Sequence, residues 1–354
     1  MSKMKVAVIG CGAIADFLHI PGYEKLPDVE IKYFCDIIPE KAQEAAKKHG
    51  SGIVVTDYHD ILDDPEIEAV SVCTPNNMHA PISIDFLRAG KNVLCEKPAA
   101  RTYAEVEEMI KAQHETGKML IIGVVNRFNT AVNKIKEMID NGDLGEVYHV
   151  YSCFRRHRGI PGIGGAFTTK AISGGGALID LGVHFLDIVM YCTGDPKPLT
   201  VSAKTYTKLG TPIKDYVYDD MWAIDRMDVN GTFDVDDFVT GLVRTDGPTI
   251  SINGAWAQNI GENEAYIDFL GTKAGIRLWY GREFKVYTTK DGKLYDYIPE
   301  FESVNMFDHE IECFVDAVKN GKKLPSDINT VAVTSKMMQA IYDSSDSRKE
   351  IILD

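Results

Sequence analysis

The chain has 354 residues, of which 45% are hydrophobic and 25% are charged, as is ordinary for a globular protein. Its length favours two domains over one. The formal net charge of −14 argues against nucleic acids and anionic membrane surfaces as partners.

No stretch approaches the roughly 20 apolar residues that a membrane-spanning helix needs. The N-terminus runs directly into a strand-like segment without a signal-peptide pattern, so a cytoplasmic location and no membrane partner are expected. The seven cysteines agree with this, because their number is odd and none forms a C-x-x-C pair. We predict that they are reduced core residues and that the chain holds no metal site.

Residues 1–125 alternate short apolar runs with helical patterns. Runs rich in β-branched residues, typical of parallel strands buried on both faces, occupy 4–10, 29–36, 69–75, 92–98 and 119–125. Polar-faced segments that close on glycine, a common helix stop, lie between them at 39–50, 80–90 and 101–117. This order predicts an α/β fold whose N-terminal part is a doubly wound parallel sheet of the Rossmann type.

The rhythm changes after a helix expected at 126–145. Strand-like segments joined by Gly, Asp and Lys turns lie at 146–155, 236–246, 248–256, 265–275 and 284–298. A helical segment at 176–194 interrupts them, and two more helices are expected at 307–321 and 327–347. We predict a first domain at 1–125 and a C-terminal α+β domain at 126–354 with a mostly antiparallel sheet. The last helices are expected to pack back on the first domain.

The segment VAVIGCGAIA places a G-x-G-x-x-A pattern directly after the first strand. Gly10 permits the tight turn, Gly12 lets the backbone approach a pyrophosphate, and the small Ala15 allows close helix–strand packing. The second strand ends in Asp36, where an acid accepts hydrogen bonds from the adenosine ribose. Because a carboxylate repels a 2′-phosphate, NAD is favoured over NADP. The alternative is a ligand-free turn with Asp36 as a helix cap.

Two later strands end at the same carboxyl edge, where ligands of such folds bind. In CTPNNMHA, Thr74, Pro75 and Asn76 are expected to run along the cofactor. His79 is expected to cap the next helix, with a partly exposed helix-start residue as an equal alternative.

The segment LCEKPAA ends a core strand with Glu96 and Lys97, charges that are costly to bury unless they are paired or used. A lysine at this edge could exchange a proton with a substrate hydroxyl, while Glu96 holds the ammonium in place and Pro98 stiffens the turn. A purely structural ion pair at a strand end carries equal weight on this pattern alone.

Asp180 and His184 lie four residues apart in an expected helix, and therefore on one face. Three glycines at 174–176 precede them and leave the backbone free to approach another group. A lone histidine in such a helix is usually a satisfied core residue. An Asp/His pair in a chain that carries a dinucleotide turn indicates acid–base chemistry instead.

Together these motifs resemble the Gfo/Idh/MocA oxidoreductases, the family of glucose–fructose oxidoreductase and inositol dehydrogenase. The resemblance covers essentially the whole chain and rests on GCGAIA, TPNNMHA, CEKPAA, GVVNRFN and GGGALIDLGVHFLD, in this order. It implies a Rossmann domain joined to a domain with a large open sheet. It also implies oxidation or reduction of a carbinol of a sugar, polyol or sugar derivative with a nicotinamide cofactor. The catalytic positions that it implies are Lys97, Asp180 and His184.

The predicted site extends beyond these three residues. The predicted cofactor-binding residues are Gly10, Gly12, Ala13, Ile14, Asp36, Thr74, Pro75, Asn76, His79, Glu96 and Lys97. The predicted substrate-binding residues are Lys97, Arg127, Arg155, Arg156, His157, Asp180 and His184. The motif CFRRHRGIPG, with the glycine run and GVH, looks more like the branch that acts on glycosides and anhydrosugars, some members of which oxidise the ring 3-hydroxyl. A basic, solvated strand end is the alternative for 155–157.

We therefore predict an NAD-dependent oxidoreductase that transfers hydride between nicotinamide and a secondary hydroxyl or ketone of a sugar, polyol or glycoside. His184 is expected to take the hydroxyl proton, Lys97 to polarise the oxygen and relay protons, and Asp180 to orient the imidazole or hold a neighbouring hydroxyl. The alternatives are a redox-neutral, NAD-using glycosidase and a non-catalytic sugar or dinucleotide sensor. A homodimer or homotetramer through the open sheet is expected, since that sheet would otherwise expose an apolar face.

Two other sequence features are not expected to form a ligand-binding site. The segment DRMDVNGTFDVDD resembles a calcium loop only loosely, because Arg226 and Asp237 stand where an EF-hand has Asp and Glu, and a solvated acidic loop is expected. Trp222, Trp256 and Trp279 are predicted to be core or subunit contacts.

Overall fold

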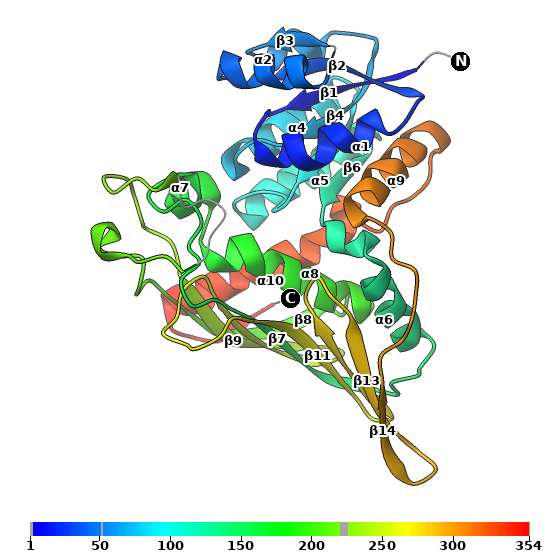
Figure 1. Cartoon of the computed structure of the whole chain (residues 1–354), viewed down its shortest axis with the longest axis vertical. Helices are drawn as coiled ribbons and strands as arrows, with labels where there is room; N and C mark the ends of the chain where they lie inside the picture. Colours follow the sequence, from blue (N-terminus) through cyan, green and yellow to red (C-terminus); the bar gives the residue numbers. More distant parts are fainter. Residues whose placement is uncertain (1–2, 51, 220–225, 354) are drawn as a thin grey trace. The chain divides into compact units, whose positions relative to one another are not determined.

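The computed structural model describes residues 3–50, 52–219 and 226–353, so the prediction for Trp222 lies outside the described residues. The chain forms two compact units, each built from two segments (Figure 1). Unit 1 comprises Met1–Phe128 and Val304–Ala332, and unit 2 comprises Asn129–Ser303 and Val333–Asp354.

Unit 1 contains a six-stranded sheet in which every neighbouring pair is parallel, in the order β3-β2-β1-β4-β5-β6. Its strands are β1 (Met4–Ile9), β2 (Val29–Cys35), β3 (Ile53–Val55), β4 (Ile67–Val72), β5 (Asn92–Glu96) and β6 (Leu120–Gly123). The predicted Rossmann-type sheet is confirmed, with the short β3 as an addition. The order reverses between β1 and β4, and ligands of such sheets bind at the carboxyl ends of the strands at this point.

Helices pack on both faces of this sheet and close two apolar cores. They are η1 (Ala15–His19), α1 (Ile20–Glu24), α2 (Pro39–Lys48), α3 (His59–Leu62), η2 (Asn76–Met78), α4 (His79–Arg88), α5 (Tyr103–Thr116), η3 (Val125–Phe128) and α9 (Met306–Asn320). One core lies under α1, α2 and α9, and the other under α4 and α5. The capping box of Thr102 and Glu105 begins α5, and Gly117 ends it in the left-handed conformation, as expected for a glycine stop.

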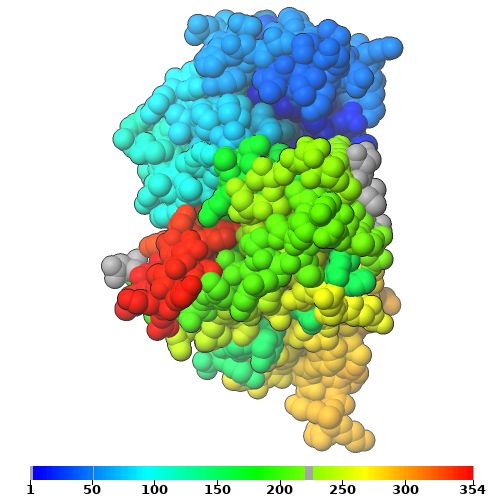
Figure 2. Space-filling model, turned by 90° about the vertical axis from the view of Figure 1, so that its left-hand side faces the viewer, coloured from blue at the N-terminus to red at the C-terminus, as the bar shows by residue number. Residues whose placement is uncertain are grey.

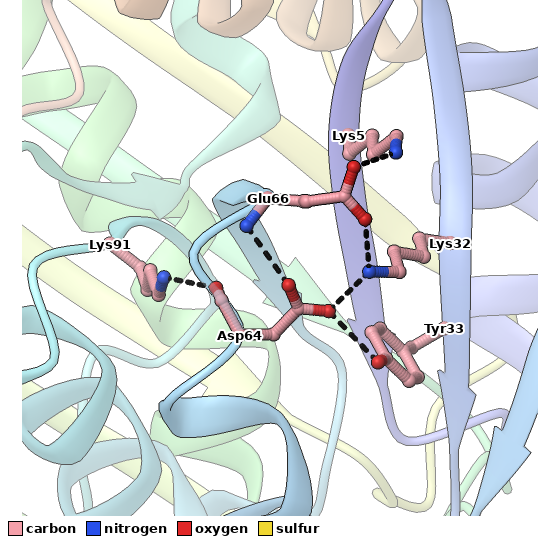
Figure 3. Close-up of polar contacts among 6 residues, drawn as sticks. All are labelled: Lys5, Lys32, Tyr33, Asp64, Glu66 and Lys91. Carbon is pink, nitrogen blue, oxygen red and sulfur yellow. Dashed lines mark hydrogen bonds and ion pairs between the residues drawn. The ribbon is translucent and has the colours of Figure 1, made fainter.

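A cluster of polar side chains links β2 to the segments that precede β4 and β5 (Figure 3). The Asp64 carboxylate accepts hydrogen bonds from Lys32, from the Tyr33 hydroxyl at 2.9 Å and from the backbone amide of Glu66 at 2.9 Å. Burial opposes the charged form, but these bonds and the Lys32 charge lower the pKa of Asp64 to about 2. The Lys91 ammonium donates to the Asp64 carbonyl, so β2, β4 and β5 are held together at this end.

Unit 2 contains a nine-stranded sheet in the order β14-β13-β12-β11-β7-β10-β9-β8-β15. Its strands are β7 (Val147–Arg155), β8 (Pro198–Tyr206), β9 (Phe238–Thr245), β10 (Thr249–Ala255), β11 (Glu264–Gly271), β12 (Ala274–Trp279), β13 (Phe284–Lys290), β14 (Lys293–Tyr297) and β15 (Ile351–Ile352). Among the described strands of this sheet, β7 and β10 alone pair in parallel, which confirms the prediction of a mostly antiparallel sheet.

Helices cover one face of this sheet, where the largest apolar core lies (Figure 1). The helical elements of unit 2 are α6 (Thr130–Asp140), η4 (Ala166–Thr168), α7 (Lys170–Ser173), η5 (Leu178–Gly182), α8 (Val183–Cys192), η6 (Ile213–Asp215) and α10 (Ile328–Ser347), whose first turn belongs to unit 1. The core side chains come from α6, α8, α10 and alternate strand residues. The β13–β14 hairpin projects at one end, with Leu294 93% exposed at its tip (Figure 2).

The segment Lys170–Cys192 is long and apolar enough to cross a membrane by length and composition, contrary to the prediction that no stretch approaches this. Within the described residues, 72% of its most apolar window is buried inside the protein, as in a core helix. Its hydrophobicity therefore follows from its place under the sheet of unit 2.

The cysteines are all free, and all but Cys313 are buried, which agrees with the prediction of reduced core residues. Burial raises the pKa of the Cys11 thiol and of the Cys35 thiol to about 12, so neither behaves as a nucleophile. Among the described residues, no group of three or more His, Cys, Asp or Glu is placed to hold a metal ion.

Candidate cofactor and catalytic site

The glycine turn follows β1 at the carboxyl edge of the unit 1 sheet. Gly10 has φ +89°, and a Cβ there would lie 2.6 Å from the Cys73 carbonyl oxygen, so this position requires glycine. At Gly12 an added Cβ would meet no atom within 4 Å. The turn therefore has a rigid first glycine and an open second one, which is the cradle that a pyrophosphate needs.

Asp36 follows β2 and lies against this turn. Its Oδ2 accepts a hydrogen bond from the Cys11 amide at 2.9 Å, and its Oδ1 accepts one from the Ile38 amide at 2.9 Å. The carboxylate is thus fixed beside the cradle, where the ribose of a bound dinucleotide lies in such folds. Gly10, Gly12, Ala13, Ile14 and Asp36 are the residues that would hold NAD from this side.

His79 does not cap α4, contrary to one prediction. The helix begins at His79 itself, and the ring is only 1% exposed. Nδ1 lies 2.7 Å from the Pro98 carbonyl oxygen and Nε2 lies 2.8 Å from the Thr74 carbonyl oxygen, so both ring nitrogens donate. Burial opposes the charged ring, but the Cys95 side chain and the two carbonyls raise the pKa of His79 to about 9. The imidazolium fastens the loop after β4 to the loop after β5.

Glu96 ends β5 and accepts two hydrogen bonds within unit 1. Its Oε1 lies 2.9 Å from Nε2 of the His19 ring, and its Oε2 accepts the backbone amide of Lys97 at 3.1 Å. Burial opposes ionisation, but the hydrogen bond from His19 and the positive charges of Lys97 and His79 lower the pKa of Glu96. Lys97 thus leaves the sheet beside an ionised carboxylate, at the edge that carries the glycine turn.

The glycine run of unit 2 approaches another segment closely, as predicted. A Cβ on Gly176 would lie 1.8 Å from the carbonyl oxygen of Asp236, so a side chain cannot be accommodated there. The Asp236 carboxylate accepts hydrogen bonds from the amides of Gly176 and Leu178 at 2.8 and 2.9 Å and from the Tyr342 hydroxyl at 2.6 Å. Asp236 therefore anchors the start of the helical segment that carries the Asp/His pair.

Asp180 and His184 lie on successive elements of this segment. Asp180 is in the π-helical turn η5, and His184 is in the first turn of α8. The indole Nε1 of Trp256 donates to Oδ2 of Asp180 at 3.0 Å. Trp256 is fully buried, which confirms the core prediction for it and adds a hydrogen bond to the Asp180 carboxylate. The His184 ring lies 6.3 Å from the ring of Tyr280, centroid to centroid.

The basic residues after β7 make ion pairs within unit 2. Arg155 donates to the Gln258 side chain at 2.8 Å and pairs with Glu264. The His157 ring lies 3.4 Å from the Asp219 carboxylate. Arg155 and His157 therefore contact other side chains of unit 2 as well as solvent.

Arg127 belongs to unit 1 and is 2% exposed. Its Nη1 donates to the Pro325 carbonyl at 2.7 Å and to the Thr330 hydroxyl at 3.3 Å. These bonds hold the returning C-terminal segment of unit 1 to the end of its first segment.

Sequence reasoning missed several partners of the predicted site residues. They are Tyr23, Ser71 and His19 behind Glu96, and Asp236, Trp256 and Tyr280 around the Asp/His pair. Of these, Ser71 lies inside the strand-like run predicted at 69–75, and His19 follows the glycine turn by a few residues.

The strand order, the glycine turn and the Asp36 contact define unit 1 as a dinucleotide-binding domain of the oxidoreductase class. A model described as "Oxidoreductase family, NAD-binding Rossmann fold" matches residues 4–124, and the "GFO/IDH/MocA C-terminal domain" matches residues 132–277. The chain belongs to the Gfo/Idh/MocA oxidoreductase family, and unit 1 is its NAD-binding part.

Relatives support the same membership, and a solved structure shows the same fold. The chain is 31% identical over 355 residues to the D-glucoside 3-dehydrogenase of Escherichia coli (strain K12), with 99% of this chain and 98% of the relative covered. It is 29% identical to a levoglucosan dehydrogenase of Pseudarthrobacter phenanthrenivorans, covering 80% and 75% of the two chains. The crystal structure of levoglucosan dehydrogenase in complex with NADH and levoglucosan has the same fold, with a TM-score of 0.84, 23% identity and 99% of each chain covered.

Proposed function

We propose that the protein is an NAD-dependent dehydrogenase that acts on a secondary hydroxyl of a glycoside or related sugar. The observation that carries this proposal is Lys97, which follows an ionised, half-buried carboxylate at the sheet edge that also presents the open cradle of Gly12. The near-complete alignment with a D-glucoside 3-dehydrogenase supports the substrate class.

Bound NAD supplies a hydride acceptor. Gly10, Gly12, Ala13 and Ile14 would hold its pyrophosphate and Asp36 its ribose, and Thr74, Pro75, Asn76, His79, Glu96 and Lys97 complete the proposed cofactor-binding set. The Thr74 hydroxyl is buried and has no hydrogen-bond partner among the described residues, which leaves it available to a ligand.

The residues of the chain handle the proton and the substrate. His184 takes the hydroxyl proton, because an imidazole with an ordinary pKa of about 6.5 can accept it near neutral pH. The Lys97 ammonium polarises the reacting oxygen. Asp180, held by the Trp256 indole, orients the imidazole or a neighbouring hydroxyl. Arg127, Arg155, Arg156 and His157 complete the proposed substrate-binding set.

The test is a substrate panel in which NADH formation is followed by absorbance. With NAD in excess, methyl β-D-glucoside or levoglucosan is expected to give NADH in proportion to substrate consumed, and myo-inositol to give less. A Lys97→Ala sample serves as the control for contaminating dehydrogenases. Absence of NADH with every sugar, or release of free sugar from the glucoside without net NADH, would overturn the proposal.

The proposed enzyme is cytoplasmic and assembles through the uncovered face of the unit 2 sheet. Tyr151, Asp268, Arg277 and Lys285 stand in one row across four strands of that face. Arg277 pairs with Asp268, and Tyr151 is 47% exposed. Tyrosine and arginine, which both occur in this row, are among the residue types enriched at interfaces between subunits.

Light scattering on the purified protein at micromolar concentration is expected to give the mass of a dimer or tetramer. Tyr151→Glu places a charge at the centre of the row and is expected to lower the mass toward that of a monomer, whereas the exposed Lys111→Glu on α5 is the control. A wild-type protein that is monomeric at this concentration contradicts the assembly.

A further inference from the structure

A buried chain of hydrogen bonds runs through unit 1 to the carboxylate that precedes Lys97. The Tyr23 hydroxyl of α1 lies 2.8 Å from the Ser71 hydroxyl of β4, and the Ser71 hydroxyl lies 3.0 Å from Nδ1 of His19. Nε2 of His19 then reaches Glu96 at 2.9 Å. Tyr23, Ser71 and His19 are each no more than 2% exposed, so water does not compete for these bonds.

The number of available hydrogens determines which group donates and which accepts in each hydrogen bond of this series. The backbone amide of Lys97 and Nε2 of His19 both approach the Glu96 carboxylate, which accepts from both. Nε2 therefore carries the ring proton and Nδ1 accepts from Ser71, whose oxygen accepts from Tyr23. In the reverse direction the Tyr23 hydrogen would need another acceptor, and none is recorded for it among the described residues.

Glu310 of α9 shows which carboxyl of this region carries the charge. Its side chain is 3% exposed, and its Oε1 has no hydrogen-bond partner among the described residues. Burial and the negative charge of Glu96 raise the pKa of Glu310 well above its ordinary value. The neutral form of Glu310 is therefore favoured, whereas the hydrogen bonds that Glu96 accepts favour its charged form.

We propose that His19, in its Nε2–H tautomer and hydrogen-bonded through Nδ1 to the Ser71–Tyr23 pair, is a positioning residue for Lys97 that fixes the Glu96 carboxylate. The inference rests on the proposed function, in which Lys97 acts on the substrate. Because Glu96 also accepts the Lys97 amide, a Glu96 side chain that loses His19 can rotate and release the backbone from which the lysine extends.

The first experiment reads the tautomer directly and needs neither NAD nor substrate. Nitrogen NMR of the full-length protein labelled in histidine is expected to show one neutral ring in the Nε2–H form that disappears in His19→Gln. Ser71→Ala removes the donor to Nδ1 and is expected to shift the Nδ1 resonance, while the proton stays on Nε2 because Glu96 still accepts it. An Nδ1–H ring, a charged ring, or an Nδ1 resonance unmoved by Ser71→Ala would overturn the proposal.

Tyr23→Phe is the milder second variant, because it removes only a hydroxyl from a packed ring. It is expected to shift the same nitrogen resonances with little change in thermal stability. Glu310→Gln is the matched control: it replaces a neutral acid by a neutral amide of equal shape and is expected to leave the His19 resonances in place. If Glu310→Gln shifts the His19 nitrogen resonances as much as Tyr23→Phe does, the hydrogen-bond chain is not confined to Tyr23, Ser71 and His19.

The second experiment measures turnover on the best sugar of the panel. His19→Phe is expected to lower kcat by about 10-fold to 100-fold, the usual cost of losing a partner that orients a site residue. His19→Gln keeps an N–H donor to Glu96 and is expected to recover most of this loss. NAD affinity is expected to change less than twofold in both. Equal losses in His19→Phe and His19→Gln, or an unchanged kcat in His19→Phe, would overturn the positioning role.

The two experiments separate the two proposals. If no sugar reduces NAD, the proposed function fails while the tautomer measurement still decides the arrangement of His19. If sugars reduce NAD but the ring is in the wrong tautomer, the positioning proposal alone fails.

Discussion

Replacing either Lys97 or His184 with alanine is expected to lower kcat by about 10²–10⁴, the range that a positioned acid or base supplies. In the proposed mechanism, Lys97→Ala removes the ammonium that polarises the reacting oxygen, and His184→Ala removes the base that takes its proton. Neither change alters the glycine cradle, so NADH binding, measured by fluorescence titration, is expected to persist in both variants. Initial rates with a glucoside give kcat.

Two exposed residues of the same types provide controls. Lys111→Ala on α5 and His59→Ala on α3 change solvent-facing side chains of unit 1 and are expected to leave kcat unchanged. Turnover in His184→Ala is further expected to rise when imidazole is added, because free imidazole can accept the same proton. Near wild-type kcat in both Lys97→Ala and His184→Ala would refute the catalytic assignment.

Replacing each glycine of the cradle with alanine is expected to affect a different property. Gly12→Ala is expected to weaken NAD binding, and Gly10→Ala is expected to destabilise the fold. Gly12→Ala adds a methyl group to open space, so thermal unfolding is expected to be unchanged. The methyl occupies the room of the pyrophosphate, and NAD affinity is expected to fall by roughly 10-fold to 200-fold, as about 1–3 kcal/mol of overpacking implies. Calorimetric titration with NAD measures the affinity.

Gly10→Ala is expected to lower the free energy of unfolding itself by roughly 1–3 kcal/mol or more, from its left-handed φ and its clash with the Cys73 backbone. Gly50→Ala is the matched control, since Gly50 has a similar φ of +82° but no atom within 4 Å of an added Cβ. The difference between the two variants is the cost of the clash alone. If Gly12→Ala binds NAD with the affinity of the wild type, the prediction that the pyrophosphate lies against this turn is wrong.

Much of unit 1 could be predicted because its strands are buried on both faces and read as continuous apolar runs. The exception is β3, whose three residues are half-buried or exposed and are too few to show a period. In unit 2, β8 was missed for a related reason: only two of its nine residues are buried, so no alternation stands out. The segment predicted at 265–275 spans a turn, and β12 beyond it also escaped prediction.

The candidate site residues could be proposed from the sequence because they stand in contiguous motifs, whereas their hydrogen-bond partners could not. Glu96 and Lys97 are neighbours in sequence, but His19 precedes Glu96 by 77 positions and reaches it only because η1 packs over β4 and β5. Trp256 bonds Asp180 across 76 positions in the same way. Local patterns cannot specify such pairs, since only the packing of separate elements brings them together.

Each unit is completed by a late segment of the chain. Residues 304–332 complete unit 1 after most of unit 2 has been synthesised, and residues 333–354 complete unit 2 after all of unit 1. The apolar core under α1 and α2 lacks Ile311, Phe314 and Val315 until α9 has been synthesised, and unit 2 lacks its last helix until residue 347. A ribosome therefore releases nearly the entire polypeptide before either core is complete, and the usual order in which an N-terminal domain matures first does not apply. For the same reason, a chimaera that exchanges one unit with a relative must transplant two stretches of gene, and a fragment ending at residue 128 would present a bare apolar surface.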